Sequence, residues 1–233
     1  MKVLKDTICV IPARRGSKRL RLKNLRKVNG EPLIAYSIIE AKKTKLFDVV
    51  YVATEDREIA AVARKYGAIV PTLVPKKLCG DRQPSWKPCM YLIDHLKKTE
   101  GREYEDLVCL QPTSVLKKSV DIEDGVKKFK GGAHDFLVSV TPIDPHYFHW
   151  AVTPKKGGKN WQLYFGTQFM KDRHWLPQVY RPNGAIKIAN IKALIKHKNF
   201  FGPNLGVSMM PEERSLHVIS ETDLKIVSTL LSA

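Results

Sequence analysis

The stretch CVIPARRGSKRLRLKNL, residues 9–25, decides the fold, because an apolar strand pattern runs directly into a loop rich in cations. Residues 14–27 contain eight Lys or Arg and no Asp or Glu. Backbone N–H groups near Gly16, the Ser17 hydroxyl and several positive side chains can together bind a polyphosphate. We therefore interpret the loop as a triphosphate site. The alternative is a solvated basic turn that follows a strand.

Short apolar segments alternate with helical periodicity over most of the chain, which predicts an α/β fold with a mostly parallel sheet and helices on both faces. We expect strands at residues 7–13, 49–53, 69–71, 107–110, 136–140 and 185–188. We expect helices at residues 31–43, 55–66, 85–98 and 120–129. The first of these helices has Pro32 in its first turn, a position that proline tolerates.

Composition limits the classes of function. The chain has 233 residues, of which 43% are hydrophobic, and 40 Lys and Arg against 23 Asp and Glu give a formal net charge of +17. Such a charge attracts polyanions. No recognition-helix, RNP or zinc-finger pattern accompanies it, so we expect a nucleotide and an acidic sugar as ligands rather than a specific nucleic acid. No segment approaches the roughly 18 apolar residues of a membrane span, and we expect a cytoplasmic protein.

The four cysteines are Cys9, Cys79, Cys89 and Cys109, and no two of them form a CxxC pair. Cys9 and Cys109 lie inside apolar, strand-like segments. This pattern favours buried free thiols over disulfides or zinc ligands.

Residues 11–24, IPARRGSKRLRLKN, resemble the signature loop of the acylneuraminate cytidylyltransferases, the CMP-sialic acid synthetases and their CMP- or GMP-nonulosonate relatives. Later motifs follow in the family's order: GEPLIAYSI at 30–38, VYVATEDREIA at 50–60, QPTS at 111–114 and LPQVYRPNGAIKI at 176–188. The resemblance covers nearly the whole chain. It implies a Rossmann-like nucleotidyltransferase sheet with a small dimerisation insertion.

The resemblance implies that a hydroxyl of a nonulosonic acid attacks the α-phosphorus of CTP and that pyrophosphate leaves. Arg14 and Lys23 are the candidate catalytic residues, because their charges would stabilise the departing pyrophosphate. The candidate nucleotide-binding residues are Ala13, Arg14, Gly16, Ser17, Lys23, Asn24, Asp81 and Ser85. The alternatives are a catalytically impaired nucleotide- or sugar-binding homologue and a synthetase that uses GTP.

Two segments supply the candidate substrate-binding residues. Gln111, Thr113 and Ser114 follow the strand at 107–110, and open α/β sheets bind ligands at the carboxyl ends of their strands. Thr113 and Ser114 could instead cap the helix that begins near residue 119. The second group is Arg173, Tyr180, Arg181 and Asn183. Its two arginines suit a sugar carboxylate, or alternatively pair with nearby surface acids.

Residues 141–182 interrupt the alternation of strands and helices with prolines, glycines and aromatic residues. We therefore divide the chain into a nucleotide-binding core at 1–140, an insertion at 141–182 and the remainder of the core at 183–233. The resemblance implies that the insertion forms a homodimer or a dimer of dimers and completes the neighbouring sugar site. The alternative is a small separate core that folds back on its own subunit.

The sequence departs from the family at the expected metal site. Family members carry an Asp-x-Asp pair where this chain has His217 and Ile219, and Ile219 has no ligating atom. Imidazole is a poor ligand for Mg²⁺, so we expect Mg²⁺ or Mn²⁺ to be carried largely by the triphosphate. Other acids could replace the pair, or turnover could be slow. These acids are Asp81, Glu212, Glu221 and Asp223.

Overall fold

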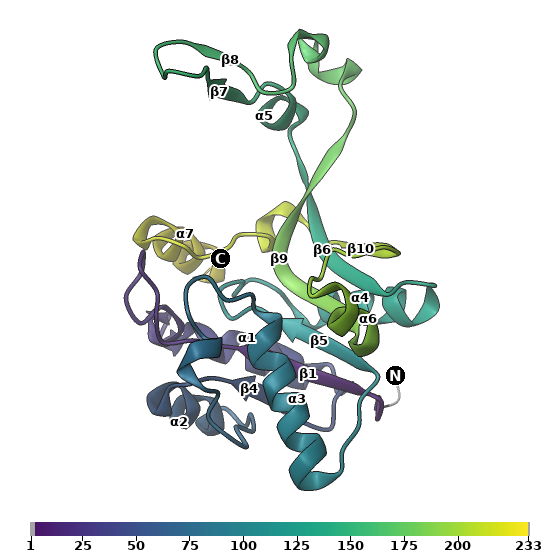
Figure 1. Cartoon of the computed structure of the whole chain (residues 1–233). Helices are drawn as coiled ribbons and strands as arrows, with labels where there is room; N and C mark the ends of the chain where they lie inside the picture. The colour runs from purple at the N-terminus through teal and green to yellow at the C-terminus, as the bar shows by residue number, and fades with distance from the viewer. Residues whose placement is uncertain (1–2, 233) are drawn as a thin grey trace.

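A six-stranded sheet forms the centre of the computed structural model, which describes residues 3–232 (Figure 1). The strand order is β10-β6-β9-β5-β1-β4. The strands are β1 (Thr7–Pro12), β4 (Val50–Ala53), β5 (Asp106–Leu110), β6 (Phe136–Ile143), β9 (Val179–Asn190) and β10 (Leu205–Met209). β1 is parallel to β4 and β5, and β10 is parallel to β6, whereas β9 is antiparallel to both of its neighbours. The prediction of a mostly parallel sheet is confirmed.

Helices cover both faces of the sheet, as the sequence predicts. Core residues of α1 (Leu33–Lys43), α2 (Arg57–Lys65) and α4 (Ser119–Gly131) pack on one face. Core residues of α3 (Trp86–Glu100) and α6 (Ile191–His197) pack on the other. The central strands are therefore buried on both sides, which explains why their sequences are almost continuously apolar.

Several local predictions need correction. The expected strand at 69–71 is a single bridge between Tyr51 and Ile69. The first helix begins at Leu33, because Glu31–Pro32 form the short strand β3, which pairs with β2 (Lys27–Val28). The expected strand at 185–188 is the middle of the twelve-residue β9. β10 was not predicted, because its side chains alternate between buried and exposed positions in a segment without a clear apolar run.

β6 and β9 continue beyond the sheet as a two-stranded ribbon, with Thr141 opposite Arg181 and Ile143 opposite Val179. The ribbon carries α5 (Pro145–His149), β7 (Val152–Pro154) and β8 (Trp161–Leu163) away from the sheet (Figure 1). We call residues 141–182 the arm.

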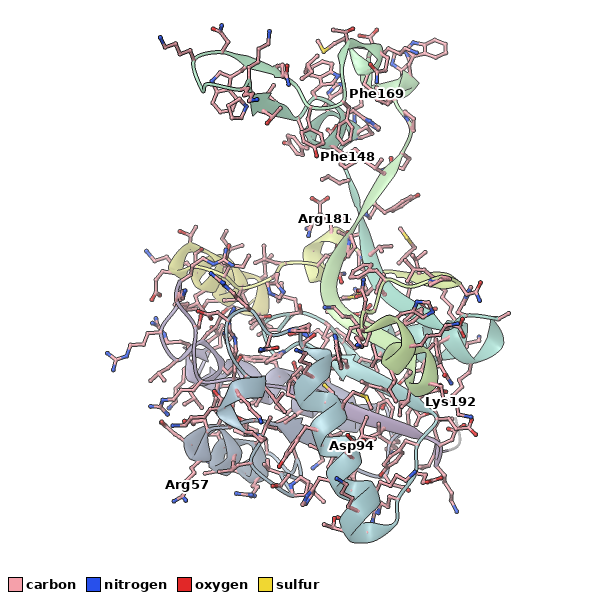
Figure 2. All side chains as sticks on the ribbon, in the orientation of Figure 1. Arg57, Asp94, Phe148, Phe169, Arg181 and Lys192 are labelled. Carbon is pink, nitrogen blue, oxygen red and sulfur yellow. The ribbon has the colours of Figure 1, made fainter. Side chains whose placement is uncertain are left out.

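Aromatic side chains form a small cluster inside the arm. The ring centroids of Phe148 and Phe165 are 4.8 Å apart, and those of His149 and Phe169 are 4.6 Å apart (Figure 2). Other aromatic side chains of the arm remain open to solvent. Tyr147 is 80% exposed, Trp175 69% and Tyr164 66%. The arm therefore has a core of its own and an apolar outer surface.

The four cysteines are buried and free, which confirms the sequence-based expectation. Within residues 3–232, none of the helices combines the length and the apolar character needed to cross a membrane.

Candidate active site

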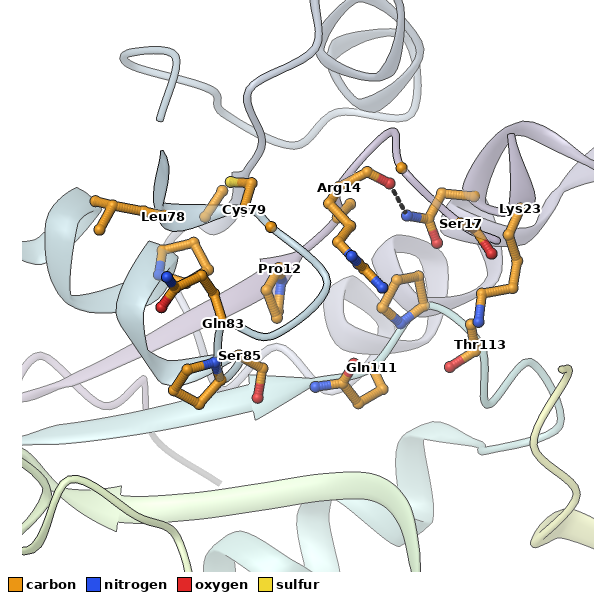
Figure 3. A pocket seen from close by; sticks show the side chains of 18 of the residues that line it. Pro12, Arg14, Ser17, Lys23, Leu78, Cys79, Gln83, Ser85, Gln111 and Thr113 are labelled. Atoms are coloured by element: carbon orange, nitrogen blue, oxygen red, sulfur yellow. Dashed lines mark hydrogen bonds between the residues drawn. The ribbon is translucent and has the colours of Figure 1, made fainter. Parts of the chain in front are cut away.

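A cavity of about 210 Å³ lies where two neighbouring strands of the sheet end. β1 and β5 are adjacent and parallel, so their carboxyl ends reach the same edge. The loop after β1 contributes Arg14 and Lys23, and the turn after β5 contributes Gln111 and Thr113 (Figure 3). The structure therefore brings the predicted triphosphate loop and the QPTS turn together. This is the edge at which open α/β sheets bind their ligands.

Buried contacts hold the loop after β1 in place. Asn24 is 6% exposed, and its side-chain Nδ2 donates a hydrogen bond of 2.8 Å to the carbonyl oxygen of Arg14 (Figure 3). Leu20 packs in an apolar cluster with Val28 and with residues of α7 (Glu221–Ser232). Asn24 thus braces the loop, in addition to its predicted contact with the nucleotide, which stays a prediction.

The cavity is positively charged. Among the described residues that line it there is no Asp or Glu, whereas both Arg14 and Lys23 face it. Burial, together with the nearby charges of Arg19 and Arg14, lowers the pKa of Lys23. Such mutual repulsion is relieved when an anion enters, so the arrangement favours a polyanionic ligand.

Arg15, which stands where the family usually has glycine, turns away from the cavity. Its backbone N–H donates to Glu55 over 2.8 Å, and its guanidinium lies 2.7 Å from Asp56 and 3.1 Å from Glu58. These acids lie just after β4, so the side chain of Arg15 is held away from the side of the loop that faces the cavity. Arg19 is exposed to solvent.

Asp81, a candidate nucleotide-binding residue, pairs with the cations of the loop. Its carboxylate accepts a hydrogen bond from Arg14 and lies 3.2 Å from Lys18 Nζ. These hydrogen bonds, from Arg14 above all, lower the pKa of Asp81. The carboxylate therefore engages one of the side chains that the phosphates are expected to engage. Ser85 lines the cavity at the start of α3.

The loop between η2 (Lys76–Leu78) and α3 lines the cavity more extensively than the sequence indicated. Leu78, Cys79 and Gln83 face the cavity in addition to Ser85 (Figure 3). Burial raises the pKa of Cys79 to about 12, so its thiol is protonated and unreactive at neutral pH. The only signal for these residues in the sequence is their place just before a helix, next to Pro84.

The turn after β5 is tied to the chain on both sides. The backbone N–H of Gln111 donates to Ala185, and that of Val218 donates to Thr113 over 2.9 Å. The hydroxyls of Thr113 and Ser114 lie 2.9 and 3.2 Å from the imidazole nitrogens of His217. They therefore do not cap α4. Its first turn is closed by Asp121, which accepts from the N–H of Lys118.

The second group of candidate substrate residues lies elsewhere. Arg173 and Arg181 line a separate hollow of about 460 Å³ at the base of the arm, and Asp144 lies there, 3.4 Å from Arg173. Tyr180 is 51% exposed and lines neither this hollow nor the first cavity. The predicted substrate residues of this chain thus do not all line one cavity.

Asn183 is only 3% exposed, and its side-chain amide forms hydrogen bonds with other side chains. Its Nδ2 donates to Ser215 over 2.9 Å, and its Oδ1 accepts from Ser139 over 2.5 Å. Asn183 thus joins β9 to β6 and to the segment that leads to His217. Its predicted contact with substrate stays a prediction.

The comparisons with known proteins identify the family. Residues 8–130, more than half of the chain, match the cytidylyltransferase family model. The chain belongs to the cytidylyltransferase family. Pseudaminic acid cytidylyltransferase of Campylobacter jejuni is 30% identical over 229 residues, which are 96% of this chain and 95% of that protein. CMP-N,N'-diacetyllegionaminic acid synthase of Campylobacter jejuni is 32% identical over 232 residues, 97% of this chain and 95% of that protein.

A solved structure shows the same fold. The CMP:2-keto-3-deoxy-manno-octonic acid synthetase complexed with CTP aligns with a TM-score of 0.73 and 16% identity, over 97% of this chain and 98% of that one. The predicted resemblance to the acylneuraminate cytidylyltransferases and the predicted Rossmann-like nucleotidyltransferase sheet are both confirmed.

Cytidylyltransferases usually use a divalent metal ion. In the described part of this chain, no group of three or more His, Cys, Asp or Glu residues could hold one. His217 lines the cavity, and burial, followed by the positive charge of Lys23, lowers its pKa to about 4, so the imidazole is neutral at pH 7. Ile219 has no ligating side-chain atom.

The acids that could have replaced the metal-binding pair are used elsewhere. Glu221 binds the guanidinium of Arg26 over 2.7 and 2.8 Å. Asp223 lies in the first turn of α7 and accepts from the N–H groups of Ile219 and Ser220. Glu212 lines the hollow at the base of the arm. The residues of the cavity therefore do not fit a resident divalent ion.

Replacement of Asp81 by Asn is expected to strengthen nucleotide binding. The triphosphate is expected to compete with this carboxylate for Arg14 and Lys18, and because exposed ion pairs are weak, the gain in affinity should not exceed roughly fivefold. Isothermal titration calorimetry with CTP measures the effect, and Asp94→Asn on the outer side of α3 is the control. A weaker affinity of the Asp81→Asn variant would assign the carboxylate a direct contact with the nucleotide.

Proposed function

We propose that this cytidylyltransferase transfers the cytidylyl group of CTP to a hydroxyl of a nonulosonic acid. The oxygen of the acceptor forms a new bond to the α-phosphorus, the bond from that phosphorus to the bridging oxygen breaks, and pyrophosphate leaves. The acceptor class is supported by the relatives, whose names specify pseudaminic acid and N,N'-diacetyllegionaminic acid. The family match supports CTP over GTP.

The observation that carries the proposal is the cationic, acid-free cavity at the ends of β1 and β5. Nucleotidyl transfer needs alignment and charge stabilisation rather than a covalent nucleophile. Arg14 and Lys23 supply positive charge for the departing pyrophosphate. Backbone N–H groups around Gly16 and the Ser17 hydroxyl can add hydrogen bonds to the phosphates. Gln111 and Thr113 face the same space from the other strand and are placed to contact the acceptor or the nucleotide.

Replacement of Lys23 by Met is expected to lower kcat/KM for CTP by about 100-fold, the cost of removing one well-placed charge from a transition state. Pyrophosphate release with CTP and a panel of nonulosonic acids measures the rate. Lys27→Met, at an exposed position of the same cationic segment, is the matched control. If the wild-type protein binds CTP but releases no pyrophosphate with any acceptor, the protein is a nucleotide-binding homologue without catalytic activity.

We infer further that the divalent ion, Mg²⁺ or Mn²⁺, arrives with the triphosphate and is not held by the protein alone. Mg²⁺ normally relies on substrate phosphates and water, so a site without carboxylates is compatible with this route. The neutral His217 and the cationic Lys23 give a free ion no negative charge to bind.

Electron paramagnetic resonance of Mn²⁺ tests this inference. Without nucleotide, the wild-type protein is expected to leave the signal of free Mn²⁺ unchanged, and addition of CTP should produce a bound species. A double variant, His217→Asp with Ile219→Asp, should bind Mn²⁺ without nucleotide, because it introduces two oxygen ligands. Binding of Mn²⁺ to the wild-type protein alone would contradict the inference.

We also propose that the arm joins two copies of this chain in a homodimer, as the resemblance to the family implies. Its outer surface exposes Tyr147, Tyr164 and Trp175, more aromatic surface than a small isolated unit usually leaves in water. Arg173 and Arg181 lie outside the cavity of their own subunit, which is consistent with a sugar site completed between subunits.

Sedimentation velocity at micromolar concentration is expected to give twice the mass of one chain. Replacement of both Tyr164 and Trp175 by Ser should shift the protein to the monomer, because it removes exposed apolar surface. The exposed Val120, on α4 and far along the chain from the arm, provides a control as Val120→Ser. A monomeric wild-type protein would exclude the dimer.

A further inference from the structure

Lys117 is the most unusual buried side chain of the described residues. It is 0% exposed, and it lies between the turn after β5 and the start of α4. It does not line the cavity, and no role was expected for it from the sequence. A lysine in such a place is rare unless its ammonium group is fully hydrogen-bonded.

The ammonium group of Lys117 has three neutral acceptors. Nζ donates to Ser37 Oγ over 2.6 Å, to the carbonyl oxygen of Gln111 over 2.9 Å and to that of Ser114 over 3.0 Å. The last two are the first and last residues of the QPTS turn. One side chain therefore fixes both ends of the turn from behind, on the side away from the cavity.

The carbonyl of Gln111 collects further donors. Besides Lys117, it accepts from Ser37 Oγ over 3.1 Å and from the backbone N–H of Ser114 over 3.3 Å. A carbonyl held in this way cannot rotate outward. The side chains of Gln111 and Thr113 are consequently kept on the cavity side, where they line the proposed site.

The arrangement is costly, because no carboxylate of the described residues lies within ion-pair distance of Lys117. Burial is the main reason that its pKa falls to about 7, although Cys9, Glu40 and Asp121 oppose the shift. At neutral pH both forms are therefore present: the charged form can donate all three hydrogen bonds, whereas the neutral amine can donate two. An apolar side chain of similar length would avoid the cost of burying a charge. The hydrogen bonds to the turn are what such a replacement would lose.

We propose that Lys117 is a positioning residue, which holds the carbonyl oxygens of Gln111 and Ser114 and thereby aims Gln111 and Thr113 at the acceptor sugar. The effect on catalysis rests on the proposed cytidylyl transfer. The effect on the turn does not, since it follows from the hydrogen bonds alone. Arg14 and Lys23 belong to a different loop with its own brace at Asn24, so the phosphate-binding side is independent of Lys117.

The test compares Lys117→Met with Lys118→Met, which removes the same charge at the adjacent exposed position. Lys117→Met is expected to lower kcat by about 10- to 100-fold, because small displacements of positioning groups have effects of this size. The Kd for CTP, measured by calorimetry, should change by less than about threefold, since the phosphate-binding loop is retained. Lys117→Arg should recover part of the lost rate, because its guanidinium also donates to carbonyl oxygens.

Hydrogen exchange without substrate gives a second readout. In Lys117→Met, the backbone amides of residues 111–116 should exchange at least about tenfold faster, whereas those of residues 14–25 should not change. Ser37→Ala removes one acceptor of Lys117 and one donor to Gln111, and it should produce smaller effects in the same direction. Ser37→Ala is the variant to measure if Lys117→Met does not fold.

The outcomes separate the two proposals. Unchanged kcat and unchanged exchange in Lys117→Met would overturn the role of Lys117. So would equal loss of kcat, CTP affinity and exchange protection across the whole protein, since that is the signature of a purely structural lysine. If the wild-type protein releases no pyrophosphate, the proposed function fails, and faster exchange confined to residues 111–116 would still support the contact of Lys117 with the turn.

Discussion

The site depends on the collection of positive charge at one edge of the sheet without an acid in the cavity. Cations held close together repel one another, and the pKa of Lys23 is lowered by its burial first and then by the charges of Arg19 and Arg14. The loop nevertheless keeps its shape, because buried apolar contacts of Leu20 and the hydrogen bond from Asn24 to Arg14 hold its backbone. Asp81 neutralises part of the charge from the rim. A triphosphate meets a binding surface that is already assembled.

The sheet sets the distance between the two halves of the site. Neighbouring strands lie about 4.8 Å apart, and β1 and β5 are direct neighbours. The loop after β1 and the turn after β5 therefore face each other across a space of fixed width. Each half also has its own internal brace, Asn24 in the loop and Lys117 behind the turn. Under the proposed function, alignment of the reactants thus depends on buried side chains that hold the backbone on both sides of the cavity.

Much of this arrangement could be predicted from the sequence, because the two halves of the site follow strands with unmistakable apolar patterns. The sequence predicts the cationic loop after 7–13 and the QPTS turn after 107–110 to lie at strand ends, and the structure shows that these two ends are neighbours. The antiparallel orientation of β9 could not be predicted, since the apolar pattern of a short strand is the same whether the strand pairs in a parallel or an antiparallel way. β9 returns directly from the arm beside β6, and such a return produces an antiparallel pair without a helical crossover.

Tertiary contacts create roles that the sequence does not indicate. The amide of Asn183 bonds Ser139 and Ser215, which lie far from it in the sequence, while its predicted contact with substrate stays a prediction. Lys117 carries no local signal, because its three acceptors come from α1 and from a turn that forms only when β5 is in the sheet. Residue propensity and hydrophobic periodicity depend on neighbours along the chain, so neither can predict that the ammonium group of Lys117 is buried and hydrogen-bonded.

His217 shows how one substitution changes the electrostatics of the whole cavity. A carboxylate at this position would lie among Lys23, Lys117 and Lys187, the cations that now help lower the pKa of the imidazole. The neutral ring leaves their charge uncompensated and binds the hydroxyls of Thr113 and Ser114 instead. Under the proposed function, the positive side chains therefore meet the phosphate charge without a metal ion bound by the protein alone. The same hydrogen bonds attach His217 to the turn that Lys117 holds from the other side. The residue that stands in place of a metal-binding acid is therefore also one of the residues that hold the QPTS turn.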